Sequence, residues 1–182
     1  MIQKINQIQK HKSKPNITLA IKIFELVRDI EYRIPLNEHE SNNACHGKSW
    51  LLYNLLRAYG FNARLRACSF KWSKLKIPEE FKKYIVKDDG LHAYVEICLD
   101  SNDNNLNNKW ILLDASFDSK LIKKLPVNIW DGQTDTKLQI VPIKIYNPKQ
   151  SYKLLSEYKR DYISNRKLFQ KLNKNYEKIR KM

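Results

Sequence analysis

Cys45 stands at the start of a strongly apolar stretch, NACHGKSWLLYNLLRAYGFNAR, which covers residues 43–64. The spacing of its leucines predicts a buried helix, and Gly60 is a suitable residue to end it. A thiol in the first turn of a helix lies close to unpaired backbone N–H groups and to the positive end of the helix dipole. Because this setting favours the nucleophilic thiolate, Cys45 is a candidate nucleophile. The alternative is a small apolar residue of the core.

A cysteine nucleophile needs a base, and the chain has 4 histidines. His11 lies in a polar terminus, His39 lies in a loop, and His46 would point away from Cys45 along the helix. His92 lies near the start of a predicted strand, LHAYVEICLD, whose other face is apolar. Its imidazole can therefore face one specific partner, which makes His92 the candidate base.

Asp114 closes the apolar run WILL of a further predicted strand. A carboxylate at the end of a buried strand needs a partner, because an unpaired charge there is costly. Cys45, His92 and Asp114 would lie on a helix start and two neighbouring antiparallel strands. We predict that they act as thiolate nucleophile, proton-transferring imidazole and tautomer-controlling carboxylate.

The three residues lie in phrases that resemble the transglutaminase-like superfamily of papain-fold enzymes. These phrases are a cysteine-headed helix ending LLRAYGFNAR, the strand HAYVE, and the run WILLDAS. The resemblance covers about residues 17–145, and three phrases in one order are more specific than any one of them. It implies an α+β fold in which the Cys45 helix packs on an antiparallel sheet bearing His92 and Asp114.

The resemblance also implies attack on a carboxamide or peptide carbonyl to give a thioester. Hydrolysis of that thioester would make the chain a cysteine amidohydrolase or peptidase with a peptide or protein substrate, which is our leading hypothesis. Transfer to an amine would instead make it a protein-glutamine acyltransferase, of transglutaminase or deamidase type. A third hypothesis is a non-catalytic binding protein with a transglutaminase-like fold.

The surroundings of the site can be predicted only in part. Asn43-Ala44 precedes the cysteine where many members of the superfamily have a glycine, so the entry loop and the substrate stay open. The backbone N–H of Cys45 is the first expected oxyanion donor, and Asn42, Asn43 or Trp72 could be the second. Cys68 and Cys98 are predicted to be inert strand residues. Residues that could line a cleft, or could simply pack, are Arg64, Arg66, Trp72, Tyr94 and Trp130.

The remaining elements follow from hydrophobic spacing and from proline, glycine and asparagine signals. We expect one catalytic domain over residues 15–148, after a flexible basic N-terminus (1–14) and before a basic amphipathic helical extension (149–182). An N-terminal helix should start at Asn16 and end at 33–35, and Asn42 or Asn43 should cap the Cys45 helix. The other expected elements are strands over 63–70, 91–99, 109–116 and 137–145, an insertion over 71–90, a polar link over 100–108, and one or two C-terminal helices from 150.

Composition narrows the setting. The formal net charge is +15, and residues 149–182 carry 11 Lys and Arg against 3 Asp and Glu, a net of +8. Binding of nucleic acid or an anionic surface through this segment is therefore an alternative, less favoured than packing of its apolar stripe on the domain. There is no bilayer-spanning run, no signal-peptide core and no paired metal-ligand motif. With 3 cysteines, which cannot all pair, we expect a cytoplasmic protein without metal or cofactor.

Overall fold

The computed structural model describes residues 16–99 and 109–182, and within them the chain is an α+β protein. The N-terminus predicted to be flexible (1–14) and the polar link (100–108) lie outside the described residues. The helices are α2 (Ile17–Arg28), α3 (Cys45–Ala58), α4 (Glu79–Lys82), α5 (Pro148–Ser156) and α6 (Arg166–Arg180), with short 3-10 turns η1 (Trp72–Lys74) and η2 (Ser119–Leu121). The strands are β1 (Asn62–Lys71), β2 (Asp89–Cys98), β3 (Trp110–Leu113) and β4 (Lys144–Ile145).

The strands of the described residues form one antiparallel sheet in the order β3-β2-β1-β4. β1 and β2 pair along their whole length, with Ala67 opposite Ala93 and Cys68 opposite His92. Alternate side chains of a strand point to opposite faces. The small and branched apolar side chains of one face pack against α3 and belong to one core cluster with the buried residues of α2, as the alternation predicts. They include Ala63, Leu65, Ala67, Ala93, Val95, Ile97, Ile111 and Leu113.

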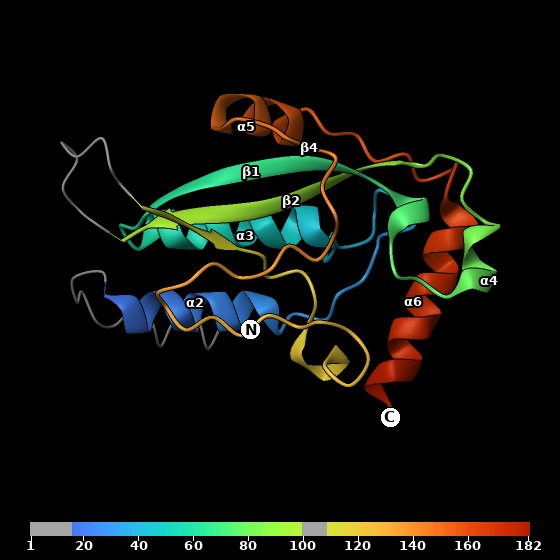
Figure 1. Cartoon of the computed structure of the whole chain (residues 1–182), viewed down its shortest axis with the longest axis horizontal. Coiled ribbons are helices and arrows are strands. Elements are labelled where there is room, and N and C mark those ends of the chain that lie inside the picture. The colour runs from blue at the N-terminus through green and yellow to red at the C-terminus, as the bar shows by residue number, and fades with distance from the viewer. Residues whose placement is uncertain (1–15, 100–108) are drawn as a thin grey trace.

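The elements are arranged in layers (Figure 1). α5 covers one face of the sheet, α3 covers the other, and α2 lies against α3. α4 and α6 stand beyond one end of the sheet, and the N-terminal end of α3 points toward that same end. The fold therefore brings the start of a helix next to the end of the sheet where β2 begins.

Helix α2 is shorter than the sequence predicts. Asn16 caps it as expected, because its Oδ1 accepts a backbone N–H of the first turn at 2.9 Å. The predicted end at residues 33–35 is wrong, since the helix ends at Arg28. Further on, the backbone of Ile34 exchanges two hydrogen bonds of 2.9 and 2.8 Å with the side chain of Asn173 on α6. This tertiary contact takes the backbone groups that a longer helix would have used.

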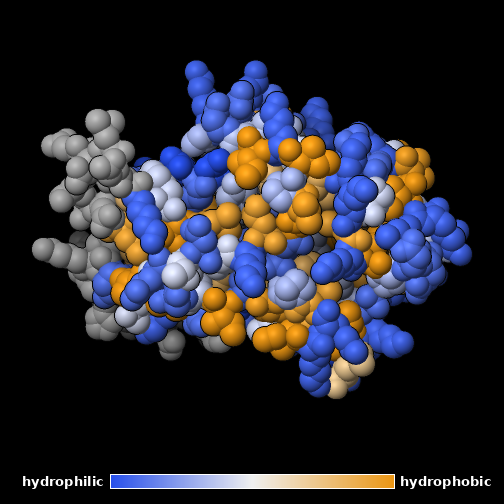
Figure 2. Space-filling view, in the orientation of Figure 1, coloured by the Kyte–Doolittle hydropathy of each residue, from blue (hydrophilic) through white to orange (hydrophobic). Residues whose placement is uncertain are grey.

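The strand predicted over 137–145 is reduced to β4, which pairs with β1. The backbone in the first half of the predicted strand forms hydrogen bonds with side chains outside the sheet. The Lys137 N–H donates to Asn128 Oδ1 at 3.2 Å, and the Gln139 N–H donates to Asp114 Oδ2 at 3.0 Å. The segment crosses the face of the molecule shown in Figure 1. Figure 2 shows groups of apolar side chains among hydrophilic ones on that face. The exposed apolar side chains of this segment include Val141, Ile143 and Ile145.

The C-terminal region forms two helices, α5 and α6, joined by residues 157–165, which we call the strap. α5 starts with a capping box between Asn147 and Gln150. α6 ends with Arg180, whose Nη2 lies 2.8 Å from the buried carboxylate of Asp118. The inward stripe of α6 is Leu168, Phe169, Leu172, Tyr176 and Ile179. No helix in the described residues is long and apolar enough to cross a membrane.

Candidate active site

The three predicted catalytic residues lie together at the end of the sheet that faces α6. Cys45 is the first residue of α3, His92 lies near the start of β2, and Asp114 directly follows β3. His92 Nε2 is 2.8 Å from Asp114 Oδ2, and the imidazole is also hydrogen-bonded to the Cys45 thiol. Cys45 is partly exposed, whereas His92 and Asp114 are buried. The hydrogen bonds therefore run from an accessible thiol through an imidazole to an enclosed carboxylate.

Both oxygens of the Asp114 carboxylate accept hydrogen bonds from neighbouring groups. Its Oδ1 accepts the Ser116 hydroxyl at 2.6 Å and the Ser116 backbone N–H at 3.1 Å, and its Oδ2 accepts the Gln139 backbone N–H at 3.0 Å. Burial alone would raise the pKa of Asp114, but His92 and these donors lower it below its ordinary value. Asp114 is therefore ionised, accepts a hydrogen bond from His92 Nε2, and leaves Nδ1 as the nitrogen available to Cys45.

His92 and Cys45 shift each other's protonation. Burial would lower the pKa of His92, yet the charges of Asp114 and Cys45 and their hydrogen bonds raise it to about 10. Burial likewise opposes ionisation of Cys45, but the charge and hydrogen bond of His92 outweigh burial and lower the pKa of the thiol. The two groups therefore favour each other's charged form, which shifts the balance toward a thiolate–imidazolium pair.

Helix α3 begins differently from the prediction. The expectation that Asn42 or Asn43 caps it is wrong, because the N-cap residue is Ala44, which offers no side-chain acceptor. Asn42 instead places its Nδ2 3.3 Å from His46 Nδ1, and His46 Nε2 lies 2.9 Å from a backbone oxygen of α5. The His46 imidazole thus contacts α5 rather than the thiol, as predicted. The first-turn N–H groups beside Cys45 receive no side-chain cap.

Gly47 allows the chain before α3 to pass close to its first turn, since an added Cβ would collide with the Asn42 carbonyl. We expect Gly47→Ala to lower the free energy of unfolding by about 1–3 kcal/mol. It should also slow alkylation of Cys45 by iodoacetamide, because α3 and the preceding loop must separate. Urea unfolding and mass spectrometry measure the two effects. Asn54→Ala, at an exposed site of α3, is the control. Normal alkylation of Cys45 in Gly47→Ala would contradict the expectation.

Lys48, in the first turn of α3, is buried and joins three segments of the chain. Its Nζ donates to the backbone oxygens of Arg28 at 2.8 Å, Ile30 at 2.9 Å and Ser116 at 2.7 Å. Burial lowers the pKa of Lys48 to about 7, although neighbouring carboxylates oppose this drop. In its protonated form, Lys48 can donate all three hydrogen bonds and ties the helix that bears the thiol to the end of α2 and to the loop that follows Asp114.

Cys45 and His92 face a cavity of about 490 Å³. Aromatic side chains form much of its wall, and among them the Trp72 ring packs on Phe70 and on Phe169 of α6, at centroid distances of 5.0 and 5.5 Å. The strap forms another side of the cavity. The C-terminal segment thus contributes directly to the surroundings of the thiol.

Most of the residues predicted to line a cleft lie elsewhere. Trp72 is the one of the five found among the described residues that line the cavity. Arg64 and Arg66 pair with a glutamate of β2, and Arg64 also stacks on the ring of Trp110. Tyr94 and Trp130 are buried. Arg64 and Arg66 alternate with apolar residues along β1, and Tyr94 and Trp130 pack in the interior. The sequence positions of these four residues therefore result from the packing of the fold and do not mark a substrate cleft.

For the second oxyanion donor, the structure narrows the predicted choices. Neither Asn42 nor Asn43 is among the described residues that line the cavity, whereas Trp72 is. The Asn43 N–H donates to Ser41 O at 3.0 Å, and the Asn43 carbonyl accepts the Arg33 N–H. The Cys45 backbone N–H therefore remains the expected donor, with Trp72 as the surviving candidate for a second.

The other cysteines differ from Cys45. Cys68 and Cys98 are buried in strands, whereas Cys45 is partly exposed. Burial raises the pKa of Cys68 to about 12, so it is a poor nucleophile. Within residues 16–99 and 109–182, no group of three His, Cys, Asp or Glu could hold a metal ion.

The fold and site define an α+β protein with a hydrogen-bonded Cys–His–Asp constellation at the edge of an aromatic cavity. Comparisons of the chain with protein-family models, with curated proteins and with solved structures find no match.

Three residues that shape the site escaped sequence reasoning: Lys48, Tyr32 and Arg160. Lys48 had a usable signal, because it sits beside the buried residues Ser49 and Leu52 on the inner side of its helix. Tyr32 and Arg160 line the cavity from segments that the sequence predicts to be helical and that are not helical in the structure. A charged run such as YKRDY is typical of a solvated helix face, so the sequence offers no local signal that it lines a cavity.

Proposed function

We propose that this protein is a cysteine amidohydrolase or peptidase that acts on a peptide or carboxamide bond through a thioester. The observation that carries the proposal is the buried His92–Asp114 pair hydrogen-bonded to a partly exposed cysteine at a helix start. A lone buried cysteine would have a raised pKa, as Cys68 has, whereas the pKa of Cys45 is lowered. The adjoining cavity gives a substrate carbonyl a route to the thiol.

The proposed reaction has two steps, formation of a thioester on Cys45 and hydrolysis of that thioester. The Cys45 thiolate attacks the carbonyl carbon, and the backbone N–H of Cys45 donates to the developing oxyanion. The His92 imidazolium gives its proton to the leaving nitrogen as the C–N bond breaks, which leaves a thioester and a neutral imidazole. His92 then takes a proton from water, the hydroxide displaces the sulfur, and an acid and the thiolate are released. Asp114 holds His92 in the required orientation throughout.

The proposal includes a papain-like, transglutaminase-type core. Its support is the chain order of a Cys45-headed helix, an antiparallel strand HAYVE, and an aspartate directly after the next strand. It also includes the cytoplasmic, reducing setting predicted from the sequence, because the mechanism requires a reduced Cys45. The buried stripe of α6 accounts for the amphipathic C-terminal pattern by packing. Binding of nucleic acid or an anionic surface through this segment therefore stays a prediction.

Substrate profiling of wild type beside Cys45→Ala tests the proposal. We expect cleaved peptide or released ammonia from wild type, with the signal reduced at least 1000-fold in Cys45→Ala, as expected for a lost nucleophile. Incorporation of a labelled amine into a glutamine donor would instead identify an acyltransferase. Equal turnover by both proteins, or none by either across peptides and carboxamides, would contradict an enzyme that depends on Cys45.

A further inference from the structure

Arg160 extends from the strap into the wall of the cavity that holds Cys45. The strap is anchored at both ends. The Asn165 side chain bonds the backbone of Val86 and Lys87 at 2.7 to 3.0 Å, and the ring of Tyr158 packs against His46 at a centroid distance of 5.1 Å. These contacts hold the strap against the cavity wall and do not involve the guanidinium of Arg160.

The guanidinium of Arg160 has no acidic partner among the described residues. Within the part of the chain that the structure describes, its buried Nε has no hydrogen-bond partner, and its Cζ lies 5.8 Å from the centroid of the Tyr158 ring. A buried donor without an acceptor costs free energy, so this atom fits a site that a ligand completes.

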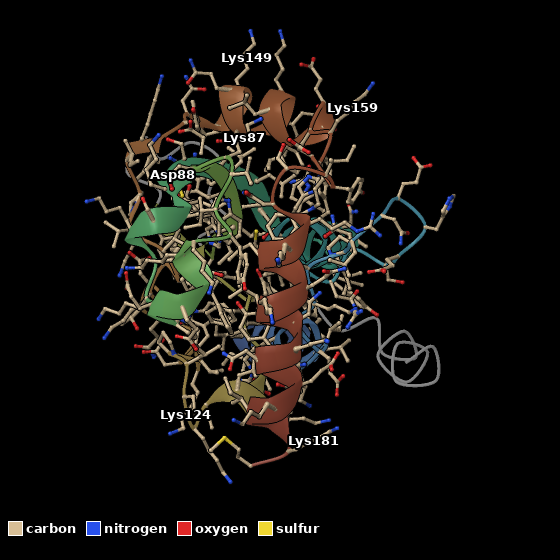
Figure 3. All side chains as sticks on the ribbon, turned by 90° about the vertical axis from the view of Figure 1, so that its right-hand side faces the viewer. Lys87, Asp88, Lys124, Lys149, Lys159 and Lys181 are labelled. Atoms are coloured by element: carbon tan, nitrogen blue, oxygen red, sulfur yellow. The ribbon has the colours of Figure 1, made fainter. Side chains whose placement is uncertain are left out.

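The carboxylates that line the same cavity are already engaged. Asp89 pairs with Lys71 at 2.8 Å, and Asp161 accepts the Ser164 hydroxyl at 2.6 Å and two backbone N–H groups at 3.0 Å. Lys87 and Lys159 add positive charge to the lining, and Figure 3 shows both near the end of α6 at which that helix begins. Three cations, Lys87, Lys159 and Arg160, therefore line the cavity together with two carboxylates whose oxygens already accept an ion pair or hydrogen bonds.

We propose that Arg160 binds a carboxylate of the substrate, so that the bond attacked by Cys45 lies beside a negatively charged group. This inference rests on the proposed function and specifies its substrate class as anionic peptides or amides. A guanidinium matches a carboxylate with paired N–H donors, and a partly desolvated site strengthens that contact. Arg160 and Cys45 line the same cavity of about 490 Å³, so the carboxylate and the scissile carbonyl can belong to one small substrate.

Two alkylating agents of nearly equal size test the proposal. Iodoacetate carries a carboxylate beside the reactive carbon, and iodoacetamide carries a neutral amide there. Both need the thiolate, so the ratio of their rates at Cys45 does not depend on the thiolate fraction. We expect Arg160→Gln to lower the iodoacetate-to-iodoacetamide ratio about tenfold, which is the size of one charge-assisted hydrogen bond. Arg57→Gln, an exposed arginine of α3, removes the same charge away from the cavity and should leave the ratio unchanged.

The outcomes separate the two proposals. If wild-type Cys45 reacts with iodoacetamide no faster than Cys68 or Cys98, the proposed function fails. If Cys45 reacts fast but Arg160→Gln and Arg57→Gln give the same ratio as wild type, the carboxylate site alone is overturned. An equal fall in both variants would show a general effect of net charge and would also overturn it.

Three acetylated dipeptides identify the source of the carboxylate by protecting Cys45 from iodoacetamide. Acetyl-alanyl-alanine has a free C-terminus, acetyl-alanyl-glutamyl amide has an acidic side chain, and acetyl-alanyl-glutaminyl amide is neutral. We expect one acidic peptide to protect at a lower concentration than the neutral one, and this advantage to vanish in Arg160→Gln. Equal protection by all three, or an advantage that survives in Arg160→Gln, would contradict the proposal. If none protects, the alkylation ratio decides.

Discussion

Replacing His92 with alanine is expected to slow the alkylation of Cys45 by iodoacetamide about 100-fold at about pH 6.5. In wild type the charge and hydrogen bond of the His92 imidazolium lower the pKa of the thiol below its ordinary value of 9.0, which raises the fraction of thiolate at neutral pH. Without His92, burial is the largest remaining influence and it raises the pKa. Each unit by which the pKa rises removes nine-tenths of the thiolate at a pH below both values.

The pH dependence makes this prediction specific. The wild-type rate should change little between the lowered pKa of Cys45 and pH 9, because the thiolate is already formed. The rate of His92→Ala should rise about tenfold per pH unit over the same range. Mass spectrometry of the Cys45 peptide gives both profiles, and His39→Ala, in an exposed loop, is the control. Parallel profiles for wild type and His92→Ala would show that the imidazole does not activate the thiol.

Replacing Lys48 with methionine is expected to lower the free energy of unfolding by about 3–5 kcal/mol. Methionine has a similar length, so the chief loss is the ammonium and its three donated hydrogen bonds. The carbonyl oxygens of Arg28, Ile30 and Ser116 would then be buried without a donor. Urea unfolding followed by circular dichroism measures the change.

Lys124→Met is the matched control, because Lys124 is exposed and its loss should change the stability by less than about 0.5 kcal/mol. A loss of similar size in both variants would mean that the net charge, rather than the buried ammonium, determines the stability. In the folded fraction of Lys48→Met, Cys45 should also be alkylated more slowly, since Lys48 links α3 to the loop after Asp114.

The parts of the molecule that the sequence predicts well are those governed by local pattern. Leu52 and Leu56 mark the buried side of α3, and the alternation around Ala93 and Val95 marks the inner face of β2. The sequence also indicates Cys45, His92 and Asp114 as candidate catalytic residues, because each is a polar residue at the end of an apolar helix or strand. The structure brings these three residues together.

The parts that the sequence could not predict depend on contacts between distant segments. The end of α2 and the path of residues 29–35 are coupled to Asn173, which lies on the last helix. The short β4 results from bonds of Lys137 and Gln139 to side chains outside the sheet. Arg160 lines the cavity that holds Cys45 because Asn165 anchors the strap to the loop before β2. None of these pairings leaves a periodic signal in the sequence.

The central claim, that Cys45 is a nucleophile activated by His92, is tested most directly by titrating the ultraviolet absorbance of thiolate. The difference between wild type and Cys45→Ser isolates the contribution of one thiol. We predict that one thiolate is already present at about pH 7, that it is lost only on further acidification, and that it is missing at that pH in His92→Ala. A wild-type difference signal that appears only as the pH approaches 9 would contradict this account.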